Sequence, residues 1–273
     1  MVGQDSEFRK LQVTGGSTII VSLPKEWVKS NDLKKGDIVS LEELASGDLR
    51  LSPLQGPAMK QIVSIDCCTY ETGLIDLMIG AYLSGADVIK VSCEGEISRK
   101  TRANVRDFLR DTRGMEIEHD DEKEIRIVSI LNPSELKLQV SINRMYILIS
   151  SLVRDALAVI EGEDVDLLSD IVERERQIDA RRLLLERQVA ASLQIPSVEK
   201  RLAVDRFTAM EHANIARVLE RMGDHATRLA SLVKEHSNVI KIGAEEMPLK
   251  AIPNLYYFPK QVFLSAISKL YFF

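Results

Sequence analysis

The chain has 273 residues, of which 45% are hydrophobic, 28% are charged and only 5% are aromatic, and its formal net charge at pH 7 is −5. This length predicts two or three compact units, and the scarcity of aromatic residues indicates helix-rich packing of Leu, Ile, Val and Ala. The negative charge argues against a protein that coats nucleic acid non-specifically, although it is compatible with a local basic face.

The sequence shows no sign of membrane insertion or secretion. It contains no run of about 18 apolar residues, and its first ten residues, MVGQDSEFRK, lack the apolar stretch of a signal peptide. Its three cysteines, Cys67, Cys68 and Cys93, form no C-x-x-C pair. We therefore expect a cytoplasmic protein whose cysteines are small core residues. A redox or metal-binding role for the cysteines is the alternative.

Residues 1–56 are predicted to form a small β module. β-branched and alternating residues indicate four strands, and Pro24 is typical of the start of a short helix between the second and third. The predicted strands span 11–14, 17–23, 38–41 and 49–51. Because about 50 residues bury too little surface for an independent core, we expect the module to form a homodimer through residues 8–52.

The residues from Gly16 to Lys25 and from Leu33 to Asp37 resemble the SpoVT/AbrB domain. That family forms interlocked dimers with swapped hairpins, and many of its members bind DNA. The resemblance implies that the phosphate contacts would come from Arg9, Lys10, Lys25 and Lys29. However, residues 1–56 contain seven basic and eight acidic residues, whereas DNA-binding domains are usually basic. A dimerisation module without DNA binding therefore remains an equal alternative.

Residues 57–132 are predicted to form a connecting α/β unit. Apolar alternation and helical spacing indicate strands at 61–65 and 87–92, helices at 71–83 and 98–112, and a closing hairpin of 115–117 with 124–130. Ser98 is the expected N-cap of the second helix. Glu116 and His119 form an E-x-x-H string, but residues three apart on a strand face opposite sides, so this string predicts no metal site.

Residues 133–273 are predicted to form an all-α bundle. Apolar residues recur at intervals of three and four in three segments joined by short loops, which is typical of up-and-down neighbours. The predicted helices run from an N-cap at Ser134 to Gly162, from 164 to 193 and from 198 to 234. A polar stretch follows, and Gln261 to Phe273 is again rich in apolar residues. We expect this last segment to cover an exposed face of the bundle.

Two of these helices carry paired carboxylates at or beside their apolar faces. Glu175 and Asp179 are four residues apart on the second helix, and Glu220 and Asp224 repeat this spacing on the third. Like charges at this spacing repel each other, and carboxylates near an apolar face lose hydration. A shared cation would offset both costs, and an all-oxygen ligand set favours Mg²⁺, Mn²⁺, Ca²⁺ or iron.

The alternative interpretation of these acids is a solvated helix face. In that case nearby arginines would neutralise the four carboxylates, and no ion would be needed. The arginines in question are Arg174, Arg176, Arg217 and Arg221.

The segment from Ile215 to Thr227 is similar to the signature of PhoU proteins, and Glu173 to Asp179 resembles the matching motif on the preceding helix. In that family these E/D-x-x-x-D motifs carry metal ions. The resemblance thus implies that Glu175, Asp179, Glu220 and Asp224 bind iron, manganese or magnesium. PhoU proteins have two three-helix repeats, and we expect one full repeat here with the second truncated.

The whole chain resembles archaeal PhoU-like phosphate uptake regulators with an N-terminal SpoVT/AbrB-like domain. The expected fold is therefore multidomain, with a small β swapped-hairpin module (1–56), a small α/β unit (57–132) and an all-α bundle (133–273). The resemblance implies a non-enzymatic regulator of phosphate uptake and phosphate homeostasis. Its partners would be a phosphate ABC transporter or the regulatory components of that transporter.

Two other functions were weighed against this one. The first is a DNA-binding transcriptional regulator of the AbrB type, which would use residues 8–52. The second is an oxidoreductase with a carboxylate-bridged pair of metals. Enzymes of that class place E-x-x-H strings on bundle helices, and none of the three predicted helices has one. We therefore expect no enzymatic activity.

Overall fold

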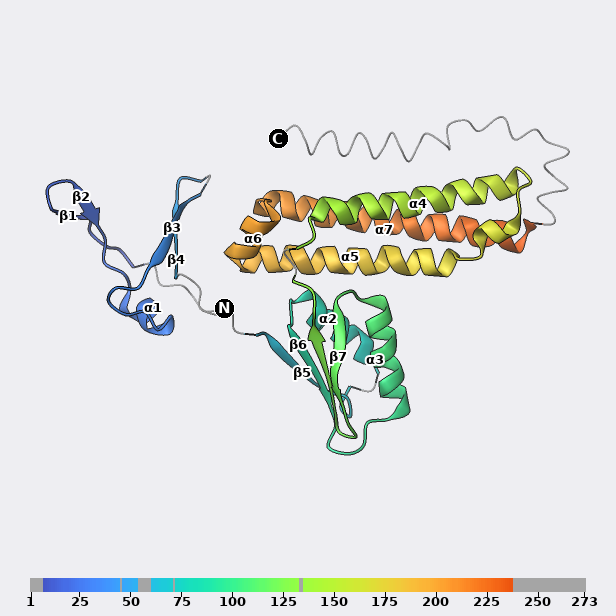
Figure 1. Ribbon diagram of the computed structural model, residues 1–273, viewed down its shortest axis with the longest axis horizontal. Helices are drawn as coiled ribbons and strands as arrows, with labels where there is room; N and C mark the ends of the chain where they lie inside the picture. The colour runs from blue at the N-terminus through green and yellow to red at the C-terminus, as the bar shows by residue number, and fades with distance from the viewer. Residues whose placement is uncertain (1–6, 45, 54–59, 71, 133–134, 238–273) are drawn as a thin grey trace. The chain divides into compact units, whose positions relative to one another are not determined.

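A computed structural model describes residues 7–44, 46–53, 60–70, 72–132 and 135–237 (Figure 1). The chain divides into two compact units, residues 1–59 and 60–273. The predicted fold class is confirmed, because small β strands are followed by a mixed α/β unit and then by a helical region. The α/β unit and the helical region belong to the same compact unit. Within the described ranges, no helix has both the length and the apolar character needed to cross a membrane.

The N-terminal unit consists of two separate hairpins and one short helix. Strands β1 (Gln12–Thr14) and β2 (Thr18–Ile20) pair antiparallel, as do β3 (Val39–Glu43) and β4 (Leu49–Pro53). Helix α1 (Lys25–Ser30) lies between the hairpins and follows Pro24, as predicted. The Gly15-Gly16 turn of the first hairpin has φ values of +61° and +90°, a region that glycine adopts without strain.

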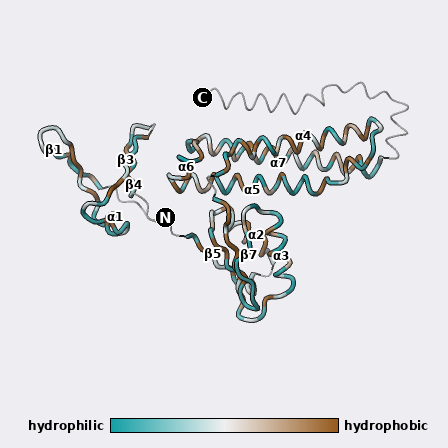
Figure 2. The backbone as a smooth tube through the Cα atoms, viewed as in Figure 1, coloured by the Kyte–Doolittle hydropathy of each residue, from teal (hydrophilic) through white to brown (hydrophobic). Residues whose placement is uncertain are grey.

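This unit has no core of its own. Among its described residues, 7–44 and 46–53, no side chain is buried. Figure 2 marks the hydrophobic residues of this unit, and those along the strands are open to solvent. Val13, Leu41 and Leu49 are 71%, 66% and 70% exposed. Because burial of apolar side chains supplies most of the stability of a fold, a single copy of this unit lacks the contacts that would hold it folded.

The α/β unit is a four-stranded sheet in the order β5-β6-β8-β7. Strand β5 (Ile62–Asp66) runs parallel to β6 (Val88–Ser92), and β7 (Met115–Asp120) and β8 (Glu124–Ser129) form the predicted hairpin. Helices α2 (Leu74–Leu83) and α3 (Arg99–Asp111) pack on the sheet around Tyr82 and Phe108. The Ser98 side chain accepts a hydrogen bond from the Thr101 amide, so the predicted N-cap is confirmed.

The helical region packs three long helices around one apolar core (Figure 1). These are α4 (Leu138–Ile160), α5 (Ile171–Gln194) and α7 (Arg206–Glu235), with a 3₁₀ turn at Val165–Leu168 and a short helix α6 (Pro196–Leu202).

Three predicted helices need correction at their N-terminal ends. The helix predicted from an N-cap at Ser134 begins at Leu138, and its N-cap is Lys137. The helix predicted at 198–234 is two helices, because Ala203 adopts a left-handed conformation and Asp205 starts α7 by accepting a hydrogen bond from the Thr208 amide. The helix predicted from 164 begins as the 3₁₀ turn. The predicted N-cap Ser134 and the apolar segment 261–273 lie outside the described residues.

The prediction that all three cysteines are core residues was wrong for two of them. Cys68 is exposed and forms a disulfide bond with Cys93, with their Cα atoms 5.6 Å apart. Both residues follow the parallel strands β5 and β6, whose carboxyl ends lie side by side. Only Cys67 is buried, and its thiol donates a hydrogen bond to the Ser92 carbonyl.

Arg187 joins the sheet unit to the bundle. This α5 residue is 2% exposed, and its guanidinium donates to the carbonyls of Tyr82 and Ala86 at 2.6 and 2.8 Å. The same guanidinium lies 4.8 Å from the centroid of the Tyr82 ring, within the range of a cation–π contact. Leu183, one turn earlier on α5, belongs to the core of the sheet unit. Helix α5 is therefore part of both cores.

We predict that Arg187→Met lowers the free energy of unfolding by about 2–4 kcal/mol, because it removes the guanidinium donors of two buried carbonyls. The Tyr82 carbonyl would keep its bond from the Gly85 amide. Arg217→Met is the matched control, since Arg217 is 59% exposed and pairs with Glu186 on the surface. Loss of this ion pair should lower the free energy of unfolding by at most about 1 kcal/mol. Urea unfolding at a fixed protein concentration measures both values, and equal losses for the two variants would contradict the role given to Arg187.

We predict that a fragment of residues 1–56 is a folded dimer at micromolar concentration. Ile19→Asp should make this fragment monomeric and unfolded, because the exposed Ile19 side chain would be buried only by a second copy. Ser17→Asp, two residues away and also exposed, serves as the control. Sedimentation and circular dichroism measure both properties. A fragment that is a folded monomer would refute the swapped-hairpin interpretation.

Candidate metal centre

Three of the four predicted carboxylates meet between α5 and α7. One oxygen each of Asp179, Glu220 and Asp224 lies within 4.8 Å of the other two. Asp179 comes from α5, while Glu220 and Asp224 are one turn apart on α7. Asp179 and Glu220 are half-buried and Asp224 is exposed, so the group opens toward solvent on one side.

Glu175, the fourth predicted residue, lies outside this group. It is one turn before Asp179 on α5, and its side chain is half-buried. Glu175 still lines the same cleft as Asp179 and Glu220, and its charge contributes to the raised pKa of Asp179. The structure thus places Glu175 in the lining of the cleft but outside the group of three acids.

The group holds uncompensated negative charge. Burial, together with the charges of Glu220, Glu175 and Asp224, raises the pKa of Asp179 to about 6, against an opposing effect of Arg182. Within the described part of the chain, neither Asp179 nor Asp224 has an ion-pair or hydrogen-bond partner. Repulsion of this kind inside a cleft is common at functional sites and is relieved by a cation.

Three of the four arginines expected to neutralise these acids pair with other carboxylates. Arg174 pairs with Asp155 and with Asp170, the latter at 2.8 Å. Arg176 pairs with Asp111 and Glu173, both at 3.2 Å, and Arg217 with Glu186 at 2.8 Å. Arg221 is exposed on α7.

Among the residues that the structure describes, Arg182 is the arginine that pairs with the group, and the sequence analysis did not identify it. Its Nε lies 3.5 Å from a Glu220 oxygen, and its Nη1 lies 3.1 Å from Glu186. Its position three residues after Asp179, on the same side of the helix, was the available signal. The single guanidinium is shared between two carboxylates, so it neutralises the group only in part.

The carboxylates open into a cleft of about 360 Å³ between the sheet unit and the bundle. Helices α2 and α3 form one side of it, and α5 and α7 form the other. Its walls hold acidic, basic and apolar side chains, namely Ile79, Arg110, Asp111, Val172, Glu175, Arg176, Asp179, Arg182, Leu183 and Glu220. The Arg176–Asp111 ion pair connects its two sides.

This donor set fits a hard divalent cation. Three carboxylates from two helices offer oxygen ligands within the span of one ion, and Asp179 would have to lose its proton on binding. Among the described residues the group contains no sulfur or imidazole ligand, which disfavours softer metals. The residues that would hold the ion are Asp179, Glu220 and Asp224, with Glu175 in reach of the same cleft.

The predicted DNA-contacting residues lie at the surface of the N-terminal unit. Lys25 and Lys29 are exposed one turn apart on α1, and Arg9 and Lys10 are exposed just before β1. The Arg9 guanidinium bonds to the carboxylate of Glu7. The two lysines therefore share one face of α1, whereas the charge of Arg9 is already paired.

Two segments of the chain match models of known families. Residues 142–233, which include α5, most of α7 and all four carboxylates, match the model of the PhoU domain. The chain has a PhoU domain. Residues 12–58 match the family described as antidote-toxin recognition MazE, a bacterial antitoxin. The predicted combination of an AbrB-like N-terminal module with a PhoU domain is confirmed. No curated protein and no solved structure matches the chain.

We predict that, in metal-free buffer, the PhoU domain loses stability as the pH rises from about 4 to about 6. The raised pKa of Asp179 means that the native state holds a proton that the unfolded state has already released in this range. Because Asp179 is partly exposed, solvent screens part of this effect, and the expected loss in the free energy of unfolding is about 1 kcal/mol. Asp179→Asn mimics the protonated form and should be more stable than the wild type at pH 7 by that amount.

Chemical denaturation in chelator at pH 4, 5, 6 and 7 measures this effect. Glu173→Gln, on the exposed side of the same helix, provides the control and should follow the wild-type profile. An Asp179→Asn variant no more stable than the wild type at pH 7 would show that the carboxylates do not strain the fold.

Proposed function

We propose that this protein is a cytoplasmic, non-enzymatic regulator of phosphate uptake and phosphate homeostasis. The PhoU domain and the unneutralised carboxylates inside it support this function. By resemblance to PhoU proteins, the partners would be a phosphate ABC transporter or its regulatory components. The protein would act by binding such a partner in a state that depends on the metal centre.

The metal in this proposal is iron, manganese or magnesium, held by Asp179, Glu220 and Asp224 with support from Glu175. The observation that carries it is the distance of 4.8 Å or less among three acids. Within the described ranges, Arg182 is the only cation that pairs with any of them. Without a cation the three charges repel one another, and Asp179 is driven toward its protonated form. A bound ion would connect α5 to α7 and would so link ion occupancy to the packing of the bundle.

The N-terminal unit is proposed to hold two copies together. Its exposed apolar strands need a partner, and its match to the MazE family agrees with the predicted swapped-hairpin dimer through residues 8–52. A dimer would present two PhoU domains to a partner. Once one domain is bound, the second is held nearby at a high effective concentration, which raises the apparent affinity for the partner.

A DNA-binding regulator of the AbrB type is the second candidate function. The exposed pair Lys25 and Lys29 on one face of α1 favours it, and dimerisation would bring two such faces together. Because each phosphate contact releases counterions, binding by these lysines would weaken steeply as salt rises. Gel-shift measurements from 50 to 200 mM salt, with Lys25→Gln/Lys29→Gln as the comparison, separate this function from dimerisation alone.

We predict that Glu220→Gln/Asp224→Asn abolishes phosphate regulation in cells. A strain without the gene should take up phosphate without normal control, and the wild-type gene should restore that control. The double variant keeps the size of both side chains but removes the charges that hold the ion, so it should fail to restore control at equal protein level. Glu173→Gln should restore it. Full restoration by the double variant would contradict the proposed role of the centre.

A further inference from the structure

The sheet has an open edge at β5. Within the described residues β5 pairs with β6 alone. The Gln61 carbonyl accepts from the Val88 amide, and the Cys67 amide donates to the Ser92 carbonyl, so odd-numbered residues bond inward to β6. Because direction alternates along a strand, the amide and carbonyl groups of Ile62 and Ser64 and the amide of Asp66 point out of the sheet, while the Asp66 carbonyl already accepts from the Tyr70 amide. Such an unpaired row is a template for another strand.

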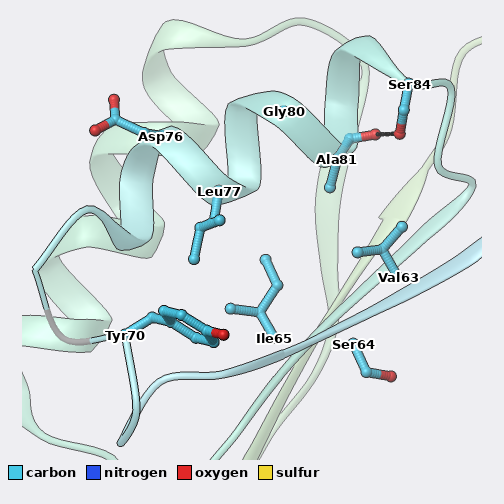
Figure 3. A pocket seen from close by; sticks show the side chains of 9 residues that line it. All are labelled: Val63, Ser64, Ile65, Tyr70, Asp76, Leu77, Gly80, Ala81 and Ser84. Atoms are coloured by element: carbon cyan, nitrogen blue, oxygen red, sulfur yellow. Dashed lines mark hydrogen bonds between the residues drawn. The ribbon is translucent and has the colours of Figure 1, made fainter.

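An apolar groove of about 420 Å³ runs beside this edge, between β5 and α2 (Figure 3). Val63 and Ile65 point into it from the strand, Leu77 points into it from the helix, and Tyr70 closes one end (Figure 3). Leu77 and Tyr70 are 40% and 51% exposed, although large apolar side chains are usually covered. The groove and the open edge therefore form one continuous surface.

Gly80 adds a separate indication that another chain approaches here. Glycine inside a helix costs about 1 kcal/mol relative to alanine. A Cβ added at Gly80 would meet no atom within 4 Å, so nothing inside this chain requires glycine at that position. Gly80 lines the groove on the strand-facing side of α2. A flat helix surface at this point leaves room for side chains that come from a neighbouring strand.

We propose that β5 pairs antiparallel with β5 of a second copy of this chain, which joins two four-stranded sheets into one of eight strands. Val63 would lie opposite Val63 of the second copy, and Lys60 opposite Asp66 of the second copy. In this register the outward amides and carbonyls of Ile62 and Ser64 find partners, and the Asp66 amide finds the Lys60 carbonyl of the second copy. The apolar side chains of both copies meet on the groove face, where Leu77 covers them.

The charges along the edge fit this register. Lys60 is exposed at the beginning of the strand, and Asp66 lies at its end. Hydrogen bonds from the Thr69 hydroxyl and the Cys68 amide lower the pKa of Asp66, so its carboxylate is ionised. Antiparallel pairing places opposite charges side by side at both ends of the new ladder, whereas parallel pairing would place like charges together.

The connection to the N-terminal unit favours a second copy over an unrelated strand. Eight residues separate Pro53, the end of β4, from Ile62, the start of β5. If two N-terminal units form one dimer, both β5 strands are tethered to that dimer within at most about 30 Å of chain. The local concentration of each β5 strand around the other would then be in the millimolar range.

Zero-length carbodiimide cross-linking of the full-length protein tests this pairing directly. Within one chain Lys60 and Asp66 are six strand positions apart, about 20 Å, so an amide bond between them can form only across two copies. A mixture of ¹⁴N- and ¹⁵N-labelled chains should yield a Lys60–Asp66 product of mixed label. Lys60→Arg keeps the charge but removes the reactive amine, and it should abolish this product. Leu77→Asp should lower its yield about tenfold.

Hydrogen exchange of the wild-type protein gives a second readout. The amides of Ile62 and Ser64 should exchange at least about tenfold more slowly than unpaired amides. Ser64→Pro removes one outward donor and leaves the bonds to β6 intact, so the Ile62 amide should lose its protection from exchange. Ser64→Ala keeps the donor, and the Ile62 amide should stay protected.

Two results would overturn the pairing. One is unprotected Ile62 and Ser64 amides with no mixed-label product. The other is protection that disappears when residues 261–273 are deleted, which would assign the edge to that segment of the same chain. These variants leave the carboxylates untouched, so failure here is distinguishable from failure of the proposed function.

Discussion

The buried guanidinium of Arg187 is the contact on which the larger unit depends. Among the described residues no carboxylate forms an ion pair with it. The Tyr82 carbonyl in the last turn of α2, the Ala86 carbonyl just after that helix and the face of the Tyr82 ring stabilise it instead. The carboxyl end of a helix carries partial negative charge, which suits a cation. Burial raises the pKa of Tyr82 to about 12, and its hydroxyl donates to the Arg113 carbonyl, so the ring is held in place from both sides. Since Arg187 lies on α5, this contact holds the sheet unit against the bundle.

The position of the carboxylate centre follows from this arrangement. Helix α5 presents Arg187 and Leu183 to the sheet unit, and two turns earlier it presents Asp179 to α7. The Arg176–Asp111 pair then connects α3 to the same stretch of α5. A change in the packing of α5 against α7 would therefore be felt by the sheet unit. This coupling is a physical route from ion occupancy to a surface that a partner could recognise.

The sequence predicted helices and strands well wherever apolar residues recurred with a single clear period. Alternation in β5 and β6 and the three- and four-residue spacing in α4 identified those elements, because burial on one face imposes those periods. The same spacing placed Asp179, Glu220 and Asp224 on facing sides of two helices. Spacing along a single helix does not give the distance between two helices. The sequence therefore could not show that Glu175 lies outside the group of three acids. The break at Ala203 was missed because an alanine in a left-handed conformation carries no signal in the sequence.

Other features depend on contacts between distant segments. The Cys68–Cys93 bridge follows from two parallel strands ending side by side, which the spacing of cysteines alone does not reveal. An arginine on a helix is usually a surface residue, so nothing marked Arg187 as buried. The exposed strands of the N-terminal unit were anticipated, because a module of that size cannot bury a core without a partner. Here the prediction came from a size limit and required no particular contact.

The central claim is that Asp179, Glu220 and Asp224 hold a divalent cation, and the metal content of the purified protein tests it most directly. Full-length chains are loaded separately with manganese, iron or magnesium, freed of excess ion and analysed by mass spectrometry. The account predicts at least one bound ion per chain in the wild type and in Glu173→Gln. It predicts none in Glu220→Gln/Asp224→Asn, whose circular dichroism should be unchanged. Undiminished metal in that double variant would contradict the account.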